Sequence, residues 1–265
     1  MVRLLHAART DVGMIRSGNE DNFAVTARGN RGLFIVADGM GGHAAGEVAS
    51  EMAVQTIEHE LDGLRDLDDS TGERLSQALR KANRNIHERT ITEVDKQGMG
   101  TTASVLLIYD SKYLIGQVGD SRVYLLRDGA LHQLTKDHSY VQEQVDAGFL
   151  TPEQARYHPY SNVITRCVGA SPDVEPDIYH GDVSVGDLFL VASDGLTSMV
   201  DDRRLQILLM SRAEPERKVL ALISEANGRG GLDNITAIVV QIAADEDGGG
   251  PGVVRADGDA SRPSA

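Results

Sequence analysis

Two aspartates that follow apolar segments have side chains that could bind a metal ion. Residues 33–37 form an apolar run of strand length ending at Asp38, and residues 188–192 form a second run shortly before Asp194. Each aspartate is followed by glycine, Gly39 in the first case, which allows a tight turn. Two such strands could bring two carboxylates to one edge of a core, where oxygen ligands suit a hard divalent cation. A single Asp-Gly pair, taken alone, is more typical of an ordinary turn.

Other charged residues share this placement beside expected strands and glycines. Asp120 lies in Gly-Asp-Ser-Arg between two expected strands, and Asp233 precedes the strand expected at 237–242. Arg16, which could grip a phosphate through two parallel hydrogen bonds, lies close to further acids; a surface salt-bridge cluster is the alternative. The repeated placement favours one shared site made of Arg16, Glu20, Asp21, Asp38, Asp120, Asp194 and Asp233.

Apolar spacing predicts the elements that must position these residues. Two amphipathic helices, at 44–64 and 73–94, are expected to form an antiparallel pair covering a sheet. An antiparallel meander is expected next, with a tight hairpin at Asp128-Gly129 and strands at 101–109, 113–118, 122–127 and 130–134. Two further helices are expected around 203–210 and at 215–226.

Residues 137–169 interrupt this regular pattern. Thr151 and Pro152 resemble a capped helix start, and a loop is expected at 158–162. An insertion of this kind is either an active-site flap or a plain surface excursion, and the sequence leaves both open.

Composition limits the class of protein. With 265 residues, we expect one domain over 1–243 and a disordered Gly- and Asp-rich tail over 244–265. The balance of 26 basic against 40 acidic residues, a net charge of −14, disfavours nucleic acid and anionic membranes as partners. No apolar run approaches the ~18 residues of a membrane span. With a single cysteine, Cys167, and no secretory signal, we expect a cytoplasmic protein.

Six motifs, in order, make the chain resemble the metal-dependent protein serine/threonine phosphatases of type 2C, and in particular their bacterial branch. The resemblance spans roughly residues 7–242. It rests on RSGNEDN from Arg16, VADGMGGHAAGE from Val36, GTT from Gly100, GDSR from Gly119, SDGL from Ser193 and DNIT from Asp233.

The resemblance implies a four-layer αββα sandwich, in which pairs of helices flank two antiparallel β-sheets. It also implies two Mn²⁺ or Mg²⁺ ions bridged by Asp38, with the carbonyl of Gly39 on one ion and Asp194 and Asp233 on the other. The resemblance further implies that Glu20 and Asp21 hold metal-bound waters and that Arg16 binds the substrate phosphate. It also implies that Asp120, together with Asp194, holds a third ion.

The implied reaction is hydrolysis of phosphoserine and phosphothreonine in proteins, opposing serine/threonine kinases. A water or hydroxide bridging the two cations would attack phosphorus without a covalent intermediate, and the chain would act as a monomer. Met40 departs from the family's eukaryotic pattern, which has a histidine proposed as the acid for the leaving alcohol. His43 is a nearby candidate, although a surface or helix-cap role is the simpler interpretation.

Two rival interpretations differ in class. A cysteine phosphatase needs an arginine six residues after its nucleophile, and the residue six beyond Cys167 is Asp173, which excludes that mechanism. Cys167 is instead expected to be a small buried residue. The remaining rival is a catalytically silent module that senses metal or binds phosphoproteins on the same fold. Such a module should have lost some carboxylates, whereas Asp38, Asp194 and Asp233 are all present.

Overall fold

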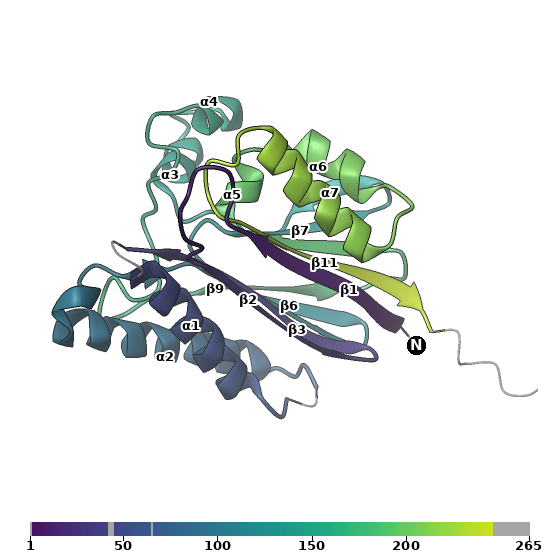
Figure 1. Ribbon diagram of the computed structural model, residues 1–265. Helices are drawn as coiled ribbons and strands as arrows, with labels where there is room; N and C mark the ends of the chain where they lie inside the picture. Colours follow the sequence, from purple (N-terminus) through teal and green to yellow (C-terminus); the bar gives the residue numbers. More distant parts are fainter. Residues whose placement is uncertain (1, 42–44, 65, 246–265) are drawn as a thin grey trace, which may run out of the picture.

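The computed structural model describes residues 2–41, 45–64 and 66–245. Two antiparallel sheets lie face to face, and helices cover the outer face of each sheet (Figure 1). This arrangement confirms the predicted αββα sandwich.

The first sheet has the strand order β1-β11-β10-β7-β8. Its strands are β1 (Val2–Asp11), β11 (Ile235–Ala244), β10 (Leu188–Ala192), β7 (Arg122–Arg127) and β8 (Ala130–Gln133). The second sheet has the order β2-β3-β5-β6-β9, with β4 paired to β3. Its strands are β2 (Asp21–Arg28), β3 (Arg31–Met40), β4 (Gly100–Thr101), β5 (Ala103–Tyr109), β6 (Lys112–Val118) and β9 (Asp177–Asp182).

Helices complete the layers. The antiparallel pair α1 (Ala45–Leu61) and α2 (Thr71–Thr92) covers the second sheet and is followed by a short 3₁₀ turn, η1 (Val94–Lys96). The first sheet is covered by α5 (Asp194–Thr197), α6 (Asp202–Leu209) and α7 (Pro215–Gly228). Two short helices, α3 (Tyr140–Asp146) and α4 (Pro152–Arg156), lie at one end of the molecule.

The apolar run before Asp38 is part of β3, and it is apolar throughout because both faces of this strand are buried. Leu33, Ile35 and Ala37 pack in the core beneath α1 and α2, whereas Phe34 and Val36 pack in the core between the two sheets. Side chains on a strand alternate between faces, so a central strand with a layer on each side has no polar face. The run before Asp194 forms β10 for the same reason, with alternate residues in the helix-side core and in the intersheet core.

The predicted four-strand meander is wrong. The strands β5 and β6 pair in the second sheet, whereas β7 and β8 pair in the first, so the chain crosses between sheets after Val118. Gly119 makes this crossing with a φ of +102°, a conformation that favours glycine. Asp120 therefore lies where the two sheets meet, and not at a hairpin within one sheet.

Local predictions fared better. The Asp128-Gly129 hairpin is confirmed, with φ values of 51° and 78° and with Arg127 opposite Ala130. Helix α4 begins with the expected capping box, formed by Thr151 and Gln154. The strands β2 and β9 and the helix α3 were not predicted. The predicted tail begins one residue early, since Ala244 still belongs to β11, and the tail over 246–265 lies outside the described residues, as does His43.

Candidate active site

The seven predicted site residues come from five places in the chain that the fold gathers near one end of the sandwich. Asp21 and Asp38 are direct partners in the β2–β3 register. Asp194 is the first residue of α5, immediately after β10, and Asp233 precedes β11. Asp38 is close enough to Asp21, Asp120, Asp194 and Asp233 for their charges to raise its pKa. The five aspartates therefore form one cluster.

Two threonines hold the backbone of Asp38. Thr102 accepts a hydrogen bond from the Asp38 amide through Oγ1, at 2.9 Å, and its own amide donates to the Asp38 carbonyl at 2.9 Å. Thr101 Oγ1 donates to the same carbonyl at 2.9 Å. The weak Gly-Thr-Thr motif thus has a positioning role that its sequence alone did not reveal. Asp38 is also inside β3 rather than at its end, because the strand continues to Met40 through pairing with β4.

Gly39 is required by a close approach of backbones. A Cβ at this position would lie 2.1 Å from the Gly46 carbonyl oxygen and 2.5 Å from that of Glu20. The Gly39 amide donates to the Glu20 carbonyl at 3.1 Å. Glu20, which is partly buried, is thereby held beside Asp38, and removal from water raises the pKa of its carboxyl.

Asp21 is a buried carboxylate supported by two hydroxyls. Ser193 Oγ donates to Oδ2 at 2.8 Å and Thr236 Oγ1 donates to it at 2.6 Å. The other oxygen, Oδ1, is buried without a hydrogen-bond partner. Burial above all, together with the nearby charge of Asp194, raises the pKa of Asp21 to about 7 against the lowering effect of the two hydroxyls.

The Asp120 turn is anchored by His138, a residue that the sequence did not single out. The Gly119 amide donates to His138 Nδ1 at 3.0 Å, and the His138 amide donates to the Gly119 carbonyl at 2.9 Å. Since Nδ1 accepts, the proton of the neutral ring is on Nε2, which lies 3.2 Å from Asp177 Oδ2. Burial lowers the pKa of His138 and favours this neutral form.

Asp194 is brought to Asp233 by another contact that only glycine permits. A Cβ on Gly195 would lie 2.0 Å from the Asn234 carbonyl oxygen, so α5 lies against the start of β11. Asp194 is also within hydrogen-bonding reach of Asp38. Removal from water, followed by the charge of Asp233, raises the pKa of Asp194.

Like charge and burial act together across the cluster. Removal from water and the charges of Asp21 and Asp194 raise the pKa of Asp38 well above its ordinary range. Removal from water also raises that of Asp120 well above its ordinary range, with Asp194 contributing next. Carboxylates gathered in this way repel one another unless protons or cations neutralise them.

Arg16 lies at the exposed edge of the cluster. Its Nη2 donates to Asp233 Oδ2 at 2.7 Å, and the two side chains are 49% and 36% exposed. An exposed guanidinium at this place can be reached by a substrate from solvent, whereas its partner is one of the predicted metal ligands.

The chemistry of the cluster fits divalent cations. Five carboxylates, an unpartnered buried oxygen on Asp21 and a raised pKa on several members make a hard, negatively charged donor set. In the described part of the chain, however, no three His, Cys, Asp or Glu side chains already converge closely enough to hold an ion as they stand. The individual ligand assignments therefore stay predictions.

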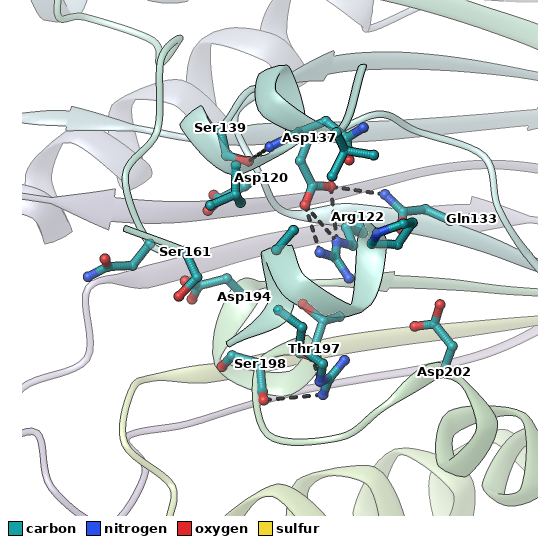
Figure 2. A pocket seen from close by; sticks show the side chains of 17 residues that line it. Asp120, Arg122, Gln133, Asp137, Ser139, Ser161, Asp194, Thr197, Ser198 and Asp202 are labelled. Atoms are coloured by element: carbon teal, nitrogen blue, oxygen red, sulfur yellow. Dashed lines mark hydrogen bonds and ion pairs between the residues drawn. The ribbon is translucent and has the colours of Figure 1, made fainter. Parts of the chain in front are cut away.

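A cavity of about 240 Å³ opens beside Asp120 and Asp194, which both face it (Figure 2). The wall formed by the insertion at 137–169 comes from α3, α4 and the loop that follows α4, and it includes Arg156 and Ser161. Arg156 Nη2 donates to the Thr197 carbonyl at 3.2 Å, which joins this insertion to α5. The insertion at 137–169 therefore borders the carboxylate cluster, as expected for a flap.

The remaining candidates have ordinary surroundings. Cys167 is a free thiol that is only partly buried, and burial raises its pKa, which disfavours the reactive thiolate. Met40 is the last residue of β3 and lies opposite Gly100. No helix in the described ranges is long and apolar enough to span a membrane.

Residues 15–223 match the protein phosphatase 2C family. The chain belongs to this family. The serine/threonine phosphatase Stp of Listeria welshimeri is 40% identical over 243 residues, which cover 89% of this chain and 96% of that protein. The protein phosphatase PhpP of Streptococcus pneumoniae is 41% identical over 236 residues, 88% of this chain and 95% of that protein. The sequence-based family assignment and the enzyme class of protein phosphatase are confirmed.

Solved structures of phosphatases have the same fold. The serine/threonine phosphatase of S. agalactiae superposes with a TM-score of 0.84 at 38% identity, covering 90% of this chain and 99% of that one. The catalytic domain of the phosphatase PstP, solved in complex with two manganese ions, gives a TM-score of 0.82 at 38% identity, covering 92% and 100%.

Proposed function

We propose that this phosphatase hydrolyses phosphoserine and phosphothreonine in proteins with two divalent cations held by its aspartate cluster. The observation that carries the proposal is the convergence of Asp21, Asp38, Asp120, Asp194 and Asp233 at one end of the sandwich. A related phosphatase with two manganese ions supports the choice of metal.

The ligand roles follow the resemblance. Asp38, the Gly39 carbonyl, Asp194 and Asp233 would hold the two ions, and Asp120 with Asp194 would hold a third. Bound there, the ions would supply hydroxide near neutral pH and neutralise charge on the phosphoryl group, so no protein nucleophile is needed.

The side chains of the protein itself would bind the substrate phosphate and orient water molecules at the ions. Arg16 can exchange its contact with Asp233 for a substrate phosphate, because it is half exposed and a guanidinium pairs equally well with phosphate oxygens. Glu20 and Asp21 lie on the side of Asp38 formed by β2 and its preceding loop, where they can accept hydrogen bonds from water. We infer that the substrates are phosphorylated cytoplasmic proteins, serine/threonine kinases among them, and that the chain acts as a monomer.

A turnover assay tests the proposal. Hydrolysis of p-nitrophenyl phosphate and of a phosphothreonine peptide is measured with Mn²⁺ and with EDTA, for the wild type and for Asp38→Asn. Turnover that needs Mn²⁺ and is lost in Asp38→Asn is expected. Asp128→Asn, at an exposed hairpin residue, is the matched control and should behave as the wild type. Tight phosphopeptide binding without turnover at any Mn²⁺ concentration would instead favour the silent binding module.

A further inference from the structure

Exposed apolar side chains concentrate on two adjoining loops beside Arg16. In the loop between β1 and β2, Met14 is 65% exposed, Ile15 is 67% exposed and Val12 is 38% exposed. In the loop before β11, Leu232 is 57% exposed. Large apolar side chains are exposed singly on most protein surfaces, but a group beside a functional site is informative.

The two loops are held together by backbone contacts. The Met14 amide donates to the Gly231 carbonyl at 2.7 Å, and a Cβ on Gly13, whose φ is +80°, would lie 2.2 Å from the Asp233 carbonyl oxygen. Figure 1 shows the purple loop after β1 running beside the yellow-green segment before β11.

The buried Asn234 side chain fixes the first loop at three points. Its Nδ2 donates to the Val12 carbonyl and to the Gly18 carbonyl, each at 2.9 Å, and its Oδ1 accepts from the Glu20 amide at 2.8 Å. These contacts hold the apolar side chains on a fixed backbone, so a partner would meet a preformed surface and less ordering entropy would oppose binding.

The exposed apolar side chains lie next to Arg16, and this closeness indicates which kind of partner the surface could bind. Ile15 is the residue next to Arg16, and Arg16 contacts Asp233, which follows Leu232. A phosphorylated side chain bound at Arg16 would place the neighbouring residues of its own peptide over these loops. The surrounding acids Glu20 and Asp233 would repel an acidic neighbour, whereas an apolar neighbour could bury surface against the loops.

We propose that Val12, Met14, Ile15 and Leu232 form an apolar subsite that selects phosphoprotein segments with an apolar side chain beside the phosphorylated residue. The inference rests on the proposed function, because it assigns the phosphate to Arg16. It adds a substrate preference that the carboxylate cluster by itself does not provide.

Matched phosphothreonine peptides test the subsite. Peptides that differ only in leucine, serine or glutamate beside the phosphothreonine are compared for kcat/KM, with p-nitrophenyl phosphate as a substrate that lacks flanking residues. The leucine peptide should exceed the serine peptide by roughly tenfold, the range for one apolar contact, and the glutamate peptide should be the slowest. The double variant Met14→Gln/Ile15→Gln should remove most of this preference and keep the wild-type rate on p-nitrophenyl phosphate.

Controls separate this inference from the proposed function. Ile207→Gln, at a 52% exposed position of α6, removes an apolar side chain from another surface and should retain the preference. Equal rates on the three peptides, or a preference unchanged in the double variant, would overturn the subsite. If no substrate were turned over, the proposed function would fail, and the subsite would then be judged by fluorescence anisotropy with the same labelled peptides. Equal affinities for the leucine and serine peptides would refute it.

Discussion

Replacing Asp21 by asparagine should stabilise the ion-free protein at alkaline pH. Asp21 is only 5% exposed, and one of its oxygens is buried without a partner. Ionising it inside the protein is unfavourable, which is why its pKa rises from 3.8 to about 7. Asparagine has nearly the same shape and carries no charge, and its oxygen can still accept hydrogen bonds from Ser193 and Thr236. Its amide nitrogen takes the place of the unpartnered Oδ1, which costs about 1–3 kcal/mol at every pH and leaves the pH dependence unaffected.

The sign and size of the effect of Asp21 on folding stability follow from the linkage between proton binding and folding. Between pH 4 and 7 the folded protein holds a proton on Asp21 that the unfolded chain has released, so folding stability falls as pH rises through this window. The full penalty above pH 7 is roughly 4 kcal/mol, an upper value, because 1.36 kcal/mol corresponds to each pH unit of a pKa shift. About half of it, roughly 2 kcal/mol, develops between pH 5.5 and pH 8.

Urea denaturation in EDTA at pH 5.5, 7 and 8 measures this contribution. The wild type should lose roughly 2 kcal/mol more than Asp21→Asn between pH 5.5 and pH 8. The carboxyls of Asp38, Asp120 and Asp194 titrate in both proteins, so the difference between the two reports Asp21 and its coupling to them. Asp128→Asn should follow the wild type. Identical pH dependence in the wild type and Asp21→Asn would refute the reasoning.

Five further substitutions are checked by steady-state kinetics in a Mn²⁺ titration. Asp38→Asn and Asp194→Asn should each lower kcat by a hundredfold or more in order of magnitude while the circular dichroism spectrum is retained, because each removes ligand charge; substantial activity at saturating Mn²⁺ would contradict this. Arg16→Ala should raise KM roughly tenfold by removing charge-assisted hydrogen bonds to phosphate, and an unchanged KM would remove Arg16 from the site. Asp120→Asn should lower kcat and preserve the melting temperature, unless Asp120 is only a turn residue, in which case kcat stays at the wild-type value. Cys167→Ser should retain most activity, and its loss in a folded variant would restore thiol chemistry as an explanation.

The sequence predicted the strands that deliver Asp38 and Asp194 because burial on both faces leaves an unmistakable pattern. A strand between a helix layer and a second sheet needs apolar residues at every position, and β3 and β10 meet that need. The tight turns expected at the following glycines were wrong, because Gly39 lies within β3 and Gly195 within α5. Each glycine is needed for a different reason, since a Cβ there would overlap a carbonyl oxygen.

The sequence could not reveal the crossing between the sheets. Gly119 and Asp120 are turn residues in a hairpin and in a crossover alike, so the local pattern is the same for both. What distinguishes the crossover is a pair of contacts at long range, with His138 on the Gly119 backbone and Thr102 on Ser121 at 2.7 Å. Strand β9 was missed for a related reason, because it is an edge strand whose residues are at most partly buried and lack a strong apolar period.

The way in which the cluster is supported explains why it should depend on cations. Neutral groups hold the carboxylates in place, namely threonine hydroxyls on the Asp38 backbone and the Ser193 and Thr236 hydroxyls on Asp21. Within the described residues, Arg16 is the only cation in an ion pair with one of the five aspartates. Such supports fix geometry and do not neutralise the negative charge. The charges of Arg122 and Arg16 offset part of it, because they lower the pKa of Asp194, and Arg122 also lowers that of Asp120, but burial and like charge outweigh them. The remaining repulsion disfavours the ion-free fold and favours ion binding. A substitution that stabilises the ion-free protein by removing this charge should therefore also weaken its affinity for Mn²⁺, and Asp21→Asn is the variant in which both effects can be measured together.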